Sequence, residues 1–354
     1  MGAYESLLRP LVFMLEPEKA QALAEWALRR RWLWRLLSWH YDYADPRLRV
    51  RAAGLEFPSP VGLAAGYDKQ CQSLDSLLAL GFGYVVGGTV LREPHPGNPR
   101  PRVMRLPKEH ALVNALGFPS VGVDAARRTL EGLQQQGNLR SKPLLVSIAG
   151  LSADDFVACH AALEPLADAL ELNISSPNTQ GLRIFQEPDT LARLLSALSA
   201  RRRKPLFVKL PPYADAPSRQ QFLALARLCA TQGVNGITVA NTRPVEAPQL
   251  AMGRGGLSGR PLLEDTLLMV VEARAAVGQK TAINACGGIY TARDTLRALR
   301  AGADTVQLLT AFVYHGPSVA GRINRGLVKL MEERGRPSLA DLIAGPDDGP
   351  APRA

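Results

Sequence analysis

Hydrophobic residues from position 59 onward form short segments rich in Val, Ile and Ala, which alternate with helical stretches and Gly/Pro turns. This alternation is typical of parallel βα units in an α/β protein. The predicted strands are 61–65, 84–87, 144–149, 169–174, 206–210, 236–240, 282–285 and 305–308. Eight such repeats predict a closed (β/α)8 TIM barrel, with its functional residues at the C-terminal ends of the strands. An open, doubly wound sheet is the alternative.

Residues 1–45 have a different pattern, which predicts two short helices. Glu16-Pro17-Glu18 opens the second helix, because Pro is favoured in the first turn. The stretch 26–39 holds all four tryptophans and four arginines but no acidic residue. Such helices either pack on their own domain or lie in a membrane interface, where Trp prefers the headgroup region and Arg meets anionic lipid. The composition favours the membrane interface.

The overall composition suits one large core. With 354 residues and 46% hydrophobic content, the chain is long enough for a barrel and a small appendage. No Cys-x-x-Cys pair and no pair of histidines at i, i+4 occurs, so we expect no metal and a reducing compartment. The net charge of +10 suits an anionic partner, but no nucleic-acid-binding motif accompanies it, and we expect no nucleic acid. The chain has no apolar run of about 18 residues, so we expect no membrane-spanning helix.

Polar residues gather at the predicted strand ends. They are 66–69, Thr89, 173–178, Lys209, Asn241-Thr242, Gly287-Gly288 and Thr310. The loops after the last two strands of such barrels often bind a phosphate through backbone N–H groups. Gly287-Gly288 and Thr310 lie in those loops, and Ser258-Gly259 could supply further donors. A tight turn is the alternative explanation for Gly-Gly after a strand.

The stretch Asn173-Ile-Ser-Ser-Pro-Asn-Thr179 is the most specific signal in the chain. Asn, Ser and Pro are also turn formers, so an ordinary strand-to-loop turn is the simplest explanation. However, two amides and two hydroxyls beside Pro177 could recognise a planar ligand rich in carbonyl and N–H groups, because Asn both donates and accepts hydrogen bonds.

Together these motifs resemble those of the dihydroorotate dehydrogenases, and specifically of the class 2, quinone-reducing branch. The likeness runs from Leu7-Leu-Arg-Pro-Leu11 and Glu16-Pro-Glu-Lys-Ala20 to the final barrel strand. Its motifs are Ala64-Ala-Gly-Tyr-Asp-Lys69, Gly88-Thr-Val90, Pro96-Gly-Asn-Pro-Arg-Pro-Arg102, Asn173-Ile-Ser-Ser-Pro-Asn-Thr-Gln-Gly-Leu-Arg183, Gly255-Gly-Leu-Ser-Gly-Arg-Pro261 and Gly287-Gly288. Class 1 relatives usually carry Cys where this chain has Ser176, and they lack the N-terminal helices, so both points favour class 2.

The resemblance implies FMN as the cofactor and dihydroorotate as the substrate. Ser176 would be the general base that removes a proton from C5 while a hydride leaves C6 for the flavin, with Thr179 and Phe118 beside the proton path. The implied substrate-binding residues are Lys69, Asn114, Ala115, Leu116, Gly117, Phe118, Asn173, Asn178, Asn241 and Thr242. The implied FMN-binding residues are Ala65, Gly66, Tyr67, Asp68, Lys69, Thr89, Ser147, Asn173, Lys209, Ala240, Gly259, Gly288, Leu309 and Thr310.

The chain departs from the family pattern at several of these positions. The usual Asn-Arg-x-Gly-Phe-Asn-Asn reads Asn114-Ala-Leu-Gly-Phe-Pro-Ser120, which removes an arginine and two asparagines near the substrate. Near the flavin, an asparagine, a threonine and a tyrosine are replaced, and we expect weaker FMN retention; the replacements are Ser147, Ala240 and Leu309. On the quinone side Gln21 replaces a common histidine, whereas Arg105 matches the family's arginine. Either side chain could donate a hydrogen bond to a quinone carbonyl.

The resemblance also sets the expected organisation. Residues 1–45 would form a membrane-associated quinone-access domain, 46–342 the FMN-binding barrel, and 343–354 a disordered, Pro-rich tail. We expect a peripheral protein at an anionic phospholipid surface, on the cytoplasmic face of the cell membrane, that oxidises dihydroorotate to orotate in de novo pyrimidine biosynthesis. Two alternatives stay open: a class 1-like dehydrogenase with a soluble acceptor, and a membrane-bound flavoprotein with altered catalysis.

Overall fold

The fold is built around a closed barrel of parallel strands. The computed structural model describes residues 4–135, 142–175 and 182–346. In barrel order the strands are β3 (Val61–Leu63), β4 (Tyr84–Val90), β7 (Leu144–Ile148), β8 (Ala169–Asn173), β9 (Leu206–Lys209), β10 (Gly236–Val239), β13 (Ala282–Cys286) and β14 (Thr305–Leu308). β14 pairs with β3 and so closes the ring. Each predicted strand overlaps one of these, so the barrel prediction is confirmed and the open sheet is excluded.

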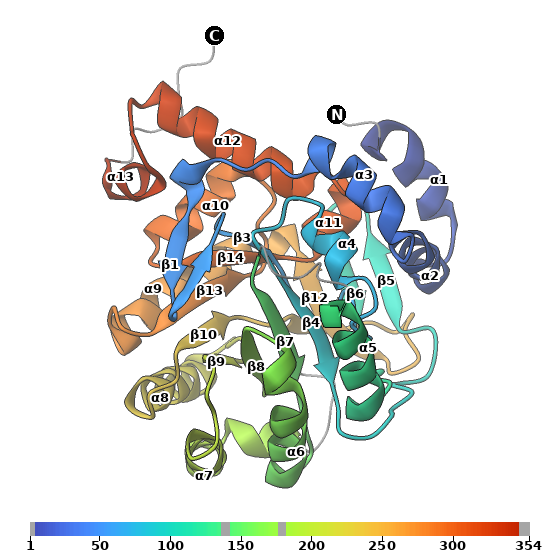
Figure 1. Ribbon diagram of the computed structural model, residues 1–354. Helices are drawn as coiled ribbons and strands as arrows, with labels where there is room; N and C mark the ends of the chain where they lie inside the picture. Colours follow the sequence, from blue (N-terminus) through green and yellow to red (C-terminus); the bar gives the residue numbers. More distant parts are fainter. Residues whose placement is uncertain (1–3, 136–141, 176–181, 347–354) are drawn as a thin grey trace.

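Helices cover the outside of the barrel (Figure 1). They are α4 (Leu74–Leu78), α5 (Val123–Gln135), α6 (Ala153–Leu163), α7 (Pro188–Ser199), α8 (Ala216–Thr231), α9 (Leu263–Val277), α10 (Ala292–Arg300), α11 (Thr310–His315), α12 (Val319–Glu333) and α13 (Leu339–Ala344). Helices α6, α8 and α10 begin with capping boxes at Ser152, Asp215 and Thr291, which fix where each loop ends. Helix α13 reaches Ala344, beyond the predicted start of the tail, and residues 347–354 lie outside the described residues.

A small antiparallel hairpin covers the N-terminal end of the barrel. It consists of β1 (Val50–Ala52) and β2 (Leu55–Phe57). The Phe57 ring lies 4.8 Å from the ring of Tyr84, between centroids, and packs with Phe207 of β9. Because this apolar plug closes one end, a ligand reaches the barrel centre from the C-terminal end of the strands.

A second sheet at the C-terminal side was not predicted. Its antiparallel strands, in the order β11, β12, β6 and β5, are Arg243–Glu246, Arg254–Gly259, Ala111–Asn114 and Val103–Leu106. Buried residues such as Val113, Leu250 and Leu257 form its own small core. Ser258-Gly259, expected to supply donors to a phosphate, lies at the end of strand β12. Strands β5 and β11 of this sheet are short and half exposed, so their hydrophobic pattern is weak.

The N-terminal region contains more helical elements than the two that the sequence predicted. A π-helical turn, η1 (Tyr4–Leu8), leads into α1 (Arg9–Met14), α2 (Pro17–Leu28) and α3 (Arg31–Tyr41). Pro17 opens α2 as expected. The stretch 26–39 is divided at Arg30, whose ψ of 65° is not helical, so the predicted helix count is wrong. These helices group at one side of the molecule, where α2 contacts β5 (Figure 1).

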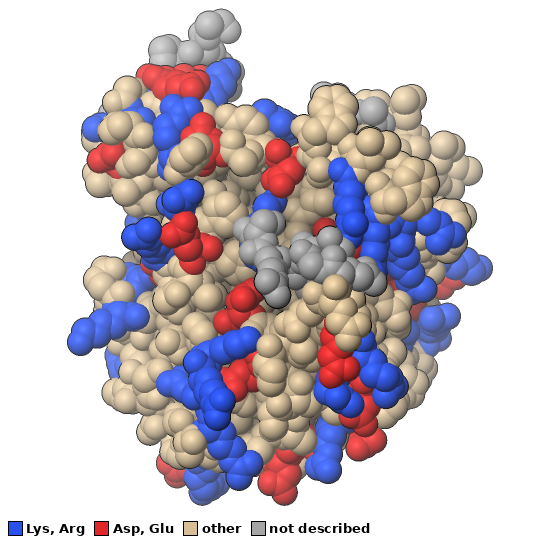
Figure 2. Space-filling model, viewed as in Figure 1, with Lys and Arg blue, Asp and Glu red and all other residues tan. Residues whose placement is uncertain are grey.

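Large apolar side chains stay exposed on these helices. They include Leu11, Met14, Trp26, Trp32 and Trp39, with Trp39 at 79% and Met14 at 83% exposure. Figure 2 shows this part of the surface as tan side chains beside blue Lys and Arg, with few acidic residues. No helix among the described residues is long and apolar enough to cross a membrane.

Candidate active site

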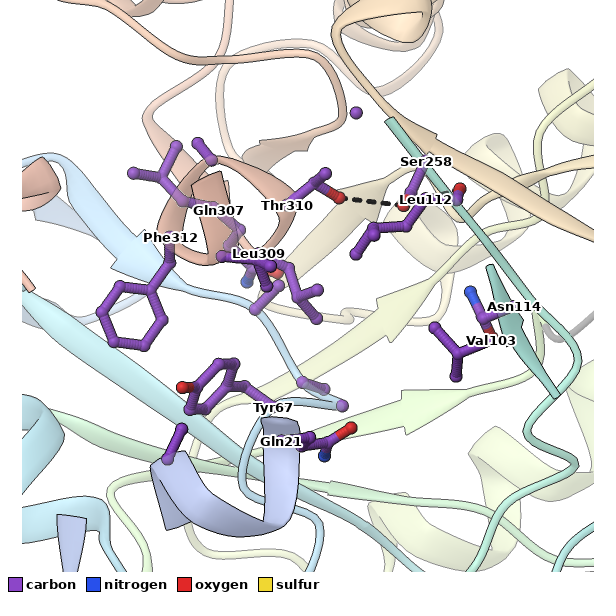
Figure 3. Close-up of a pocket in the computed structure, with 18 of the residues that line it drawn as sticks. Gln21, Tyr67, Val103, Leu112, Asn114, Ser258, Gln307, Leu309, Thr310 and Phe312 are labelled. Atoms are coloured by element: carbon purple, nitrogen blue, oxygen red, sulfur yellow. Dashed lines mark hydrogen bonds between the residues drawn. The ribbon is translucent and has the colours of Figure 1, made fainter. Parts of the chain in front are cut away.

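A single cavity of about 600 Å³ extends from the N-terminal helices to the C-terminal ends of the barrel strands. Figure 3 looks into it, with Gln21 of α2 and the hydrogen-bonded Thr310 and Ser258 among the labelled lining residues. The structure thus brings together residues from both ends of the chain. The sequence-predicted residues that line it are Gln21, Ala65, Gly66, Tyr67, Lys69, Thr89, Arg105, Asn114, Leu116, Gly117, Phe118, Asn173, Lys209, Ala240, Asn241, Thr242, Gly259, Gly288, Leu309 and Thr310.

At Gly259 and Gly288 the wall of the cavity is formed by the backbone and not by side chains. Both residues have positive φ, 101° and 74°. A Cβ at Gly288 would lie 2.3 Å from the backbone nitrogen of Leu263, and one at Gly259 would lie 2.4 Å from the carbonyl oxygen of His110. Only glycine therefore fits at these two positions. The hydroxyl of Thr310 lies beside this wall, so the space suits a phosphate group held by backbone and hydroxyl groups.

The polar floor of the cavity is a hydrogen-bonded group of amides and hydroxyls. Asn173 donates to Thr89 Oγ1 at 3.0 Å, and its Oδ1 accepts from the hydroxyl of Ser175 at 2.8 Å. Asn241 donates to the same Ser175 hydroxyl at 2.8 Å. Ser147 is fully buried behind the lining and supports Thr89 through a contact of 3.0 Å between their hydroxyl oxygens. These bonds fix how the two asparagine amides are oriented at the cavity.

Two lysines line the cavity, and both can stabilise negative charge on a ligand. Lys69 Nζ donates to the carbonyl oxygen of Gly66 at 2.6 Å, and burial lowers the pKa of Lys69. Lys209 Nζ lies 3.9 Å from Cys286 Sγ. Burial raises the pKa of the Cys286 thiol, although Lys209 opposes the shift, so the thiol keeps its proton at neutral pH. In the described part of the chain, no group of His, Cys, Asp and Glu could hold a metal ion.

Some predicted site residues do not line the cavity. Asp68 is buried and accepts hydrogen bonds from the backbone N–H groups of Gln72 and Ser73, at 3.0 and 2.7 Å. Burial raises the pKa of Asp68 although these bonds oppose the shift. Asp68 therefore shapes the turn that carries Lys69. Ala115 is buried in the core of the small sheet. The predicted residues Ser176, Asn178 and Thr179 lie outside the described residues.

The loop after β6 forms another side of the cavity. Asn114, Leu116, Gly117 and Phe118 line it. Asn98 donates to the carbonyl oxygen of Ala115 at 2.9 Å and so supports the loop from behind. Ala115, Pro119 and Ser120 replace the family's arginine and two asparagines, and the Ser120 hydroxyl accepts a hydrogen bond from the backbone N–H of Leu91 at 3.1 Å.

The outer part of the cavity is apolar and is formed by the N-terminal helices. Arg105 Nη1 donates to the carbonyl oxygens of Leu15 at 2.6 Å and Phe13 at 3.2 Å, and its guanidinium lies 4.5 Å from the centre of the Phe13 ring. Sequence reasoning missed the apolar lining residues, among them Tyr4, Leu8, Val12, Phe13, Pro17, Ala20, Ala24, Ala27, Leu28 and Trp34. On α2 these residues recur every three or four positions, which is the signal of one helix face.

Comparisons with known proteins agree with this arrangement. A sequence model for the family described as dihydroorotate dehydrogenase matches residues 47–331. Dihydroorotate dehydrogenase (quinone) of Anaeromyxobacter dehalogenans is 39% identical over 350 residues, covering 95% of each chain. The protein of the same name from Thermus thermophilus is 39% identical and covers 94% of this chain and 98% of its own. The crystal structure of DHODH from Eimeria tenella in complex with ferulenol has a TM-score of 0.84 at 32% identity, covering 94% of this chain and 98% of that one. The chain therefore belongs to the dihydroorotate dehydrogenase family.

Proposed function

We propose that this protein oxidises dihydroorotate to orotate, with FMN as the hydride acceptor and a membrane quinone as the final electron acceptor, in de novo pyrimidine biosynthesis. The observation that carries the proposal is the single cavity with two chemically different ends. Its inner end presents lysines, asparagines and hydroxyls, which suit a small anionic substrate. Its outer end lies between the N-terminal helices and is apolar, which suits a hydrophobic acceptor.

Members of this family use a flavin, and the inner cavity fits FMN. Gly259 and Gly288, which present backbone to the cavity and have no room for a Cβ, would hold the phosphate together with Thr310. Ala65, Gly66 and Thr89 would contact the ring system, and the positive charge of Lys209 would favour its electron-rich form. FMN supplies an acceptor for the hydride when it is bound. Ala240, which replaces Thr, presents no hydrogen-bonding side chain to the cavity, and Ser147, which replaces Asn, lies behind its lining, so FMN should be held less tightly than in relatives.

The substrate would lie against the polar floor. Lys69 would pair with the carboxylate of dihydroorotate, and Asn114, Asn173, Asn241 and Thr242 would bind the ring carbonyl and N–H groups. By resemblance, Asn178 joins this set and Ser176 takes the proton from C5 while the hydride leaves C6. A serine is a weak base, so it needs a site from which bulk water is excluded and an exit for the proton. The resemblance assigns that exit to Thr179 and Phe118.

The quinone would enter between the N-terminal helices and meet Arg105 and Gln21. These helices expose tryptophan and leucine side chains beside arginines, the composition of a segment that lies in a membrane interface. We therefore propose a peripheral attachment to anionic phospholipid on the cytoplasmic face. Residues 1–45 would serve as the quinone-access domain and residues 46–342 as the catalytic barrel.

The test is an assay of electron acceptors with the purified protein. Mass spectrometry of the released cofactor should identify FMN. Dihydroorotate should be converted to orotate rapidly with a short-chain quinone and slowly with NAD⁺ or fumarate. Faster turnover with a soluble acceptor would indicate a class 1-like enzyme, and an absence of turnover with every acceptor would indicate a flavoprotein with lost catalysis.

A further inference from the structure

A second, smaller cavity of about 170 Å³ adjoins the main cavity. Gln21, Lys69, Leu116 and Pro119 line both cavities, so these residues form the partition between them. Unlike the outer part of the main cavity, the small cavity is surrounded by charged side chains. Arg29 and Arg100 at its edge are exposed, so it reaches the molecular surface. A polar space of this volume has room for several water molecules.

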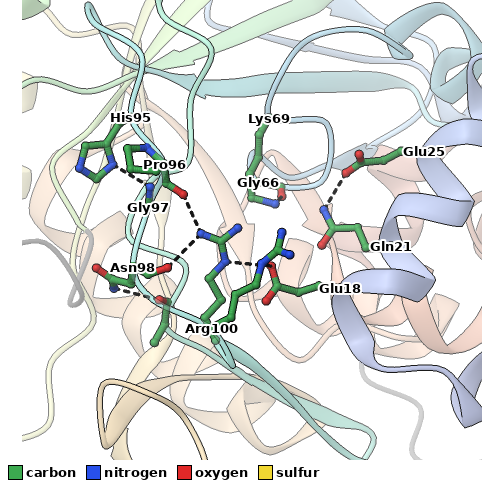
Figure 4. Close-up of polar contacts among 12 residues, drawn as sticks. Glu18, Gln21, Glu25, Gly66, Lys69, His95, Pro96, Gly97, Asn98 and Arg100 are labelled. Carbon is green, nitrogen blue, oxygen red and sulfur yellow. Dashed lines mark hydrogen bonds and ion pairs between the residues drawn. The ribbon is translucent and has the colours of Figure 1, made fainter.

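Glu25 lies in the wall of the small cavity and is bonded to the partition. Its Oε1 accepts a hydrogen bond from Gln21 Nε2 at 2.8 Å (Figure 4). Because a carboxylate only accepts, this bond turns the Gln21 nitrogen toward Glu25 and the Gln21 oxygen away from it. Glu25 is half-buried, so it contacts the solvent as well as the partition. The charged groups that face it across the small cavity are Glu18, Arg29, Asp68, Lys69, Arg100 and Arg102.

The three carboxylates of this cavity differ in their partners, and Asp68 accepts its hydrogen bonds from the backbone N–H groups of Gln72 and Ser73. Glu18 pairs with Arg102 at 2.8 Å and with Arg100 at 3.3 Å. Its other oxygen is buried without a partner among the described residues, and water in the cavity would satisfy it. Glu25 forms no ion pair within the described part of the chain, so unlike Glu18 it is not held by an arginine, and its printed side-chain hydrogen bond is the one from Gln21.

The proposed reaction requires a proton on the quinone side. Reduction of a quinone to a quinol consumes two electrons and two protons. The hydride that leaves C6 carries two electrons and one proton, whereas the proton from C5 leaves through the base. One proton must therefore enter from the solvent, and apolar lining residues cannot supply it. Gln21 occupies the position where the family commonly has histidine, which titrates near neutral pH, but an amide does not.

We propose that Glu25 takes up this proton from the small cavity and delivers it at the partition, beside Gln21, to the oxygen of the quinone. Glu25 lines the small cavity and not the main one, so a water molecule beside Gln21 carries the proton across. An O–H bond of the protonated carboxyl breaks as the water is protonated, an O–H bond of that water breaks as the O–H bond of the quinol forms, and Glu25 returns to the carboxylate. The Gln21 oxygen, fixed by Glu25, accepts the hydrogen bond of the new hydroxyl. The idea rests on the proposed function, because it assigns a residue to the quinone half of that reaction.

The test compares Glu25→Gln with Glu16→Gln in the full-length, FMN-loaded protein. Glu25→Gln keeps the size of the side chain and an oxygen that can accept from Gln21 and removes the ionisable carboxyl, whereas Glu16 lies at the exposed start of the same helix. Photoreduced protein is mixed anaerobically with a short-chain benzoquinone. Reoxidation should slow at least about tenfold in Glu25→Gln and not in Glu16→Gln, while reduction by dihydroorotate stays unchanged in both. Glu25→Asp retains a carboxyl and should keep most of the rate.

Two further readouts separate proton delivery from a structural role. Formate, a small weak acid, should restore the reoxidation rate of Glu25→Gln and leave the wild type unchanged. The Kd for the quinone, measured on oxidised protein by quenching of the cavity-lining Trp34, should be the same in both. The proposal would be overturned if the reoxidation rate of Glu25→Gln were unchanged or if formate did not restore it. Equal losses of rate in Glu25→Gln and Glu25→Asp, or a quinone Kd weakened by the same factor as the rate, would also overturn it. A wild-type protein that fails to reduce quinone would instead overturn the proposed function.

Discussion

The ion pair at Glu5 predicts how firmly the N-terminal helices are attached to the barrel. Glu5 is 7% exposed and accepts hydrogen bonds from Arg322 of α12 at 2.7 Å and from His315 of α11 at 2.5 Å. Burial would raise the pKa of the Glu5 carboxyl, but the bonds from Arg322 and His315 outweigh that effect and lower the pKa to about 2. The substitution Glu5→Gln removes the negative charge of this side chain and keeps its shape.

The magnitude follows from the difference between the folded and unfolded states. An unfolded glutamate has a pKa of about 4.3, so a folded value near 2 corresponds to about 3 kcal/mol at neutral pH. Solvent near the partly exposed Arg322 reduces this to about 1–2 kcal/mol. Because the folded pKa lies below the unfolded one, the stabilisation is fully present above about pH 5 and is lost as pH falls toward 2.

Hydrogen exchange of residues 4–41, followed by mass spectrometry, measures this attachment directly. Glu5→Gln should expose the backbone amides about tenfold more often at pH 7, since about 1.4 kcal/mol is a factor of ten. The exposed Glu16→Gln should change nothing. Tyr4 and Leu8 line the cavity, so the KM for quinone should rise while that for dihydroorotate stays constant. If the wild type and Glu5→Gln exchanged equally at pH 7, or if their difference grew as the pH fell, Glu5 would not stabilise the attachment of these helices in the way described.

Four more changes test individual parts of the site. Ser176→Ala should keep FMN and slow anaerobic flavin reduction by about 100- to 10,000-fold; an unchanged rate would remove Ser176 from the mechanism. Lys209→Ala should lower the ratio of flavin to protein absorbance, and a fully yellow, active variant would contradict a role of Lys209 in FMN binding. Gly288→Ala should lose flavin but keep its circular dichroism, because the new Cβ would lie 2.3 Å from backbone and positive φ costs about 1–2 kcal/mol. Deletion of residues 1–40 should spare reduction by dihydroorotate and abolish quinone reduction and binding to anionic vesicles; a soluble truncated protein that keeps both would show these helices to be packing elements.

The barrel could be predicted from the sequence because its strands are buried on both faces. Strands β7 and β8 are buried along their whole length and mostly apolar, and β8 ends at Asn173, which lines the cavity. Strands β5 and β11 are half exposed and four residues long, so no comparable pattern marks them. The sequence alone therefore misses the small sheet, although part of the predicted phosphate site lies on it.

The individual roles within the site depend on contacts that no local pattern shows. Ser147 and Asp68 were predicted to bind the cofactor, but in the structure they support Thr89 and the turn of Lys69 from behind. The partnership of Gln21 with Glu25 spans one helical turn and is visible in the sequence only as an i, i+4 pair of polar residues. Its importance emerges only because two cavities meet there, which is a property of the tertiary structure.

The central claim, that one cavity joins a dihydroorotate site to a quinone passage, is tested most directly by an anaerobic double-mixing experiment. Protein is mixed first with one equivalent of dihydroorotate and then with a short-chain quinone, while the flavin absorbance is followed. We expect the flavin to be bleached in the first mix, with one orotate formed for each flavin reduced. In the second mix the absorbance should return fully, at a rate that increases with quinone concentration. A flavin that dihydroorotate does not bleach, or one that NAD⁺ or fumarate reoxidises faster than quinone does, would contradict the claim.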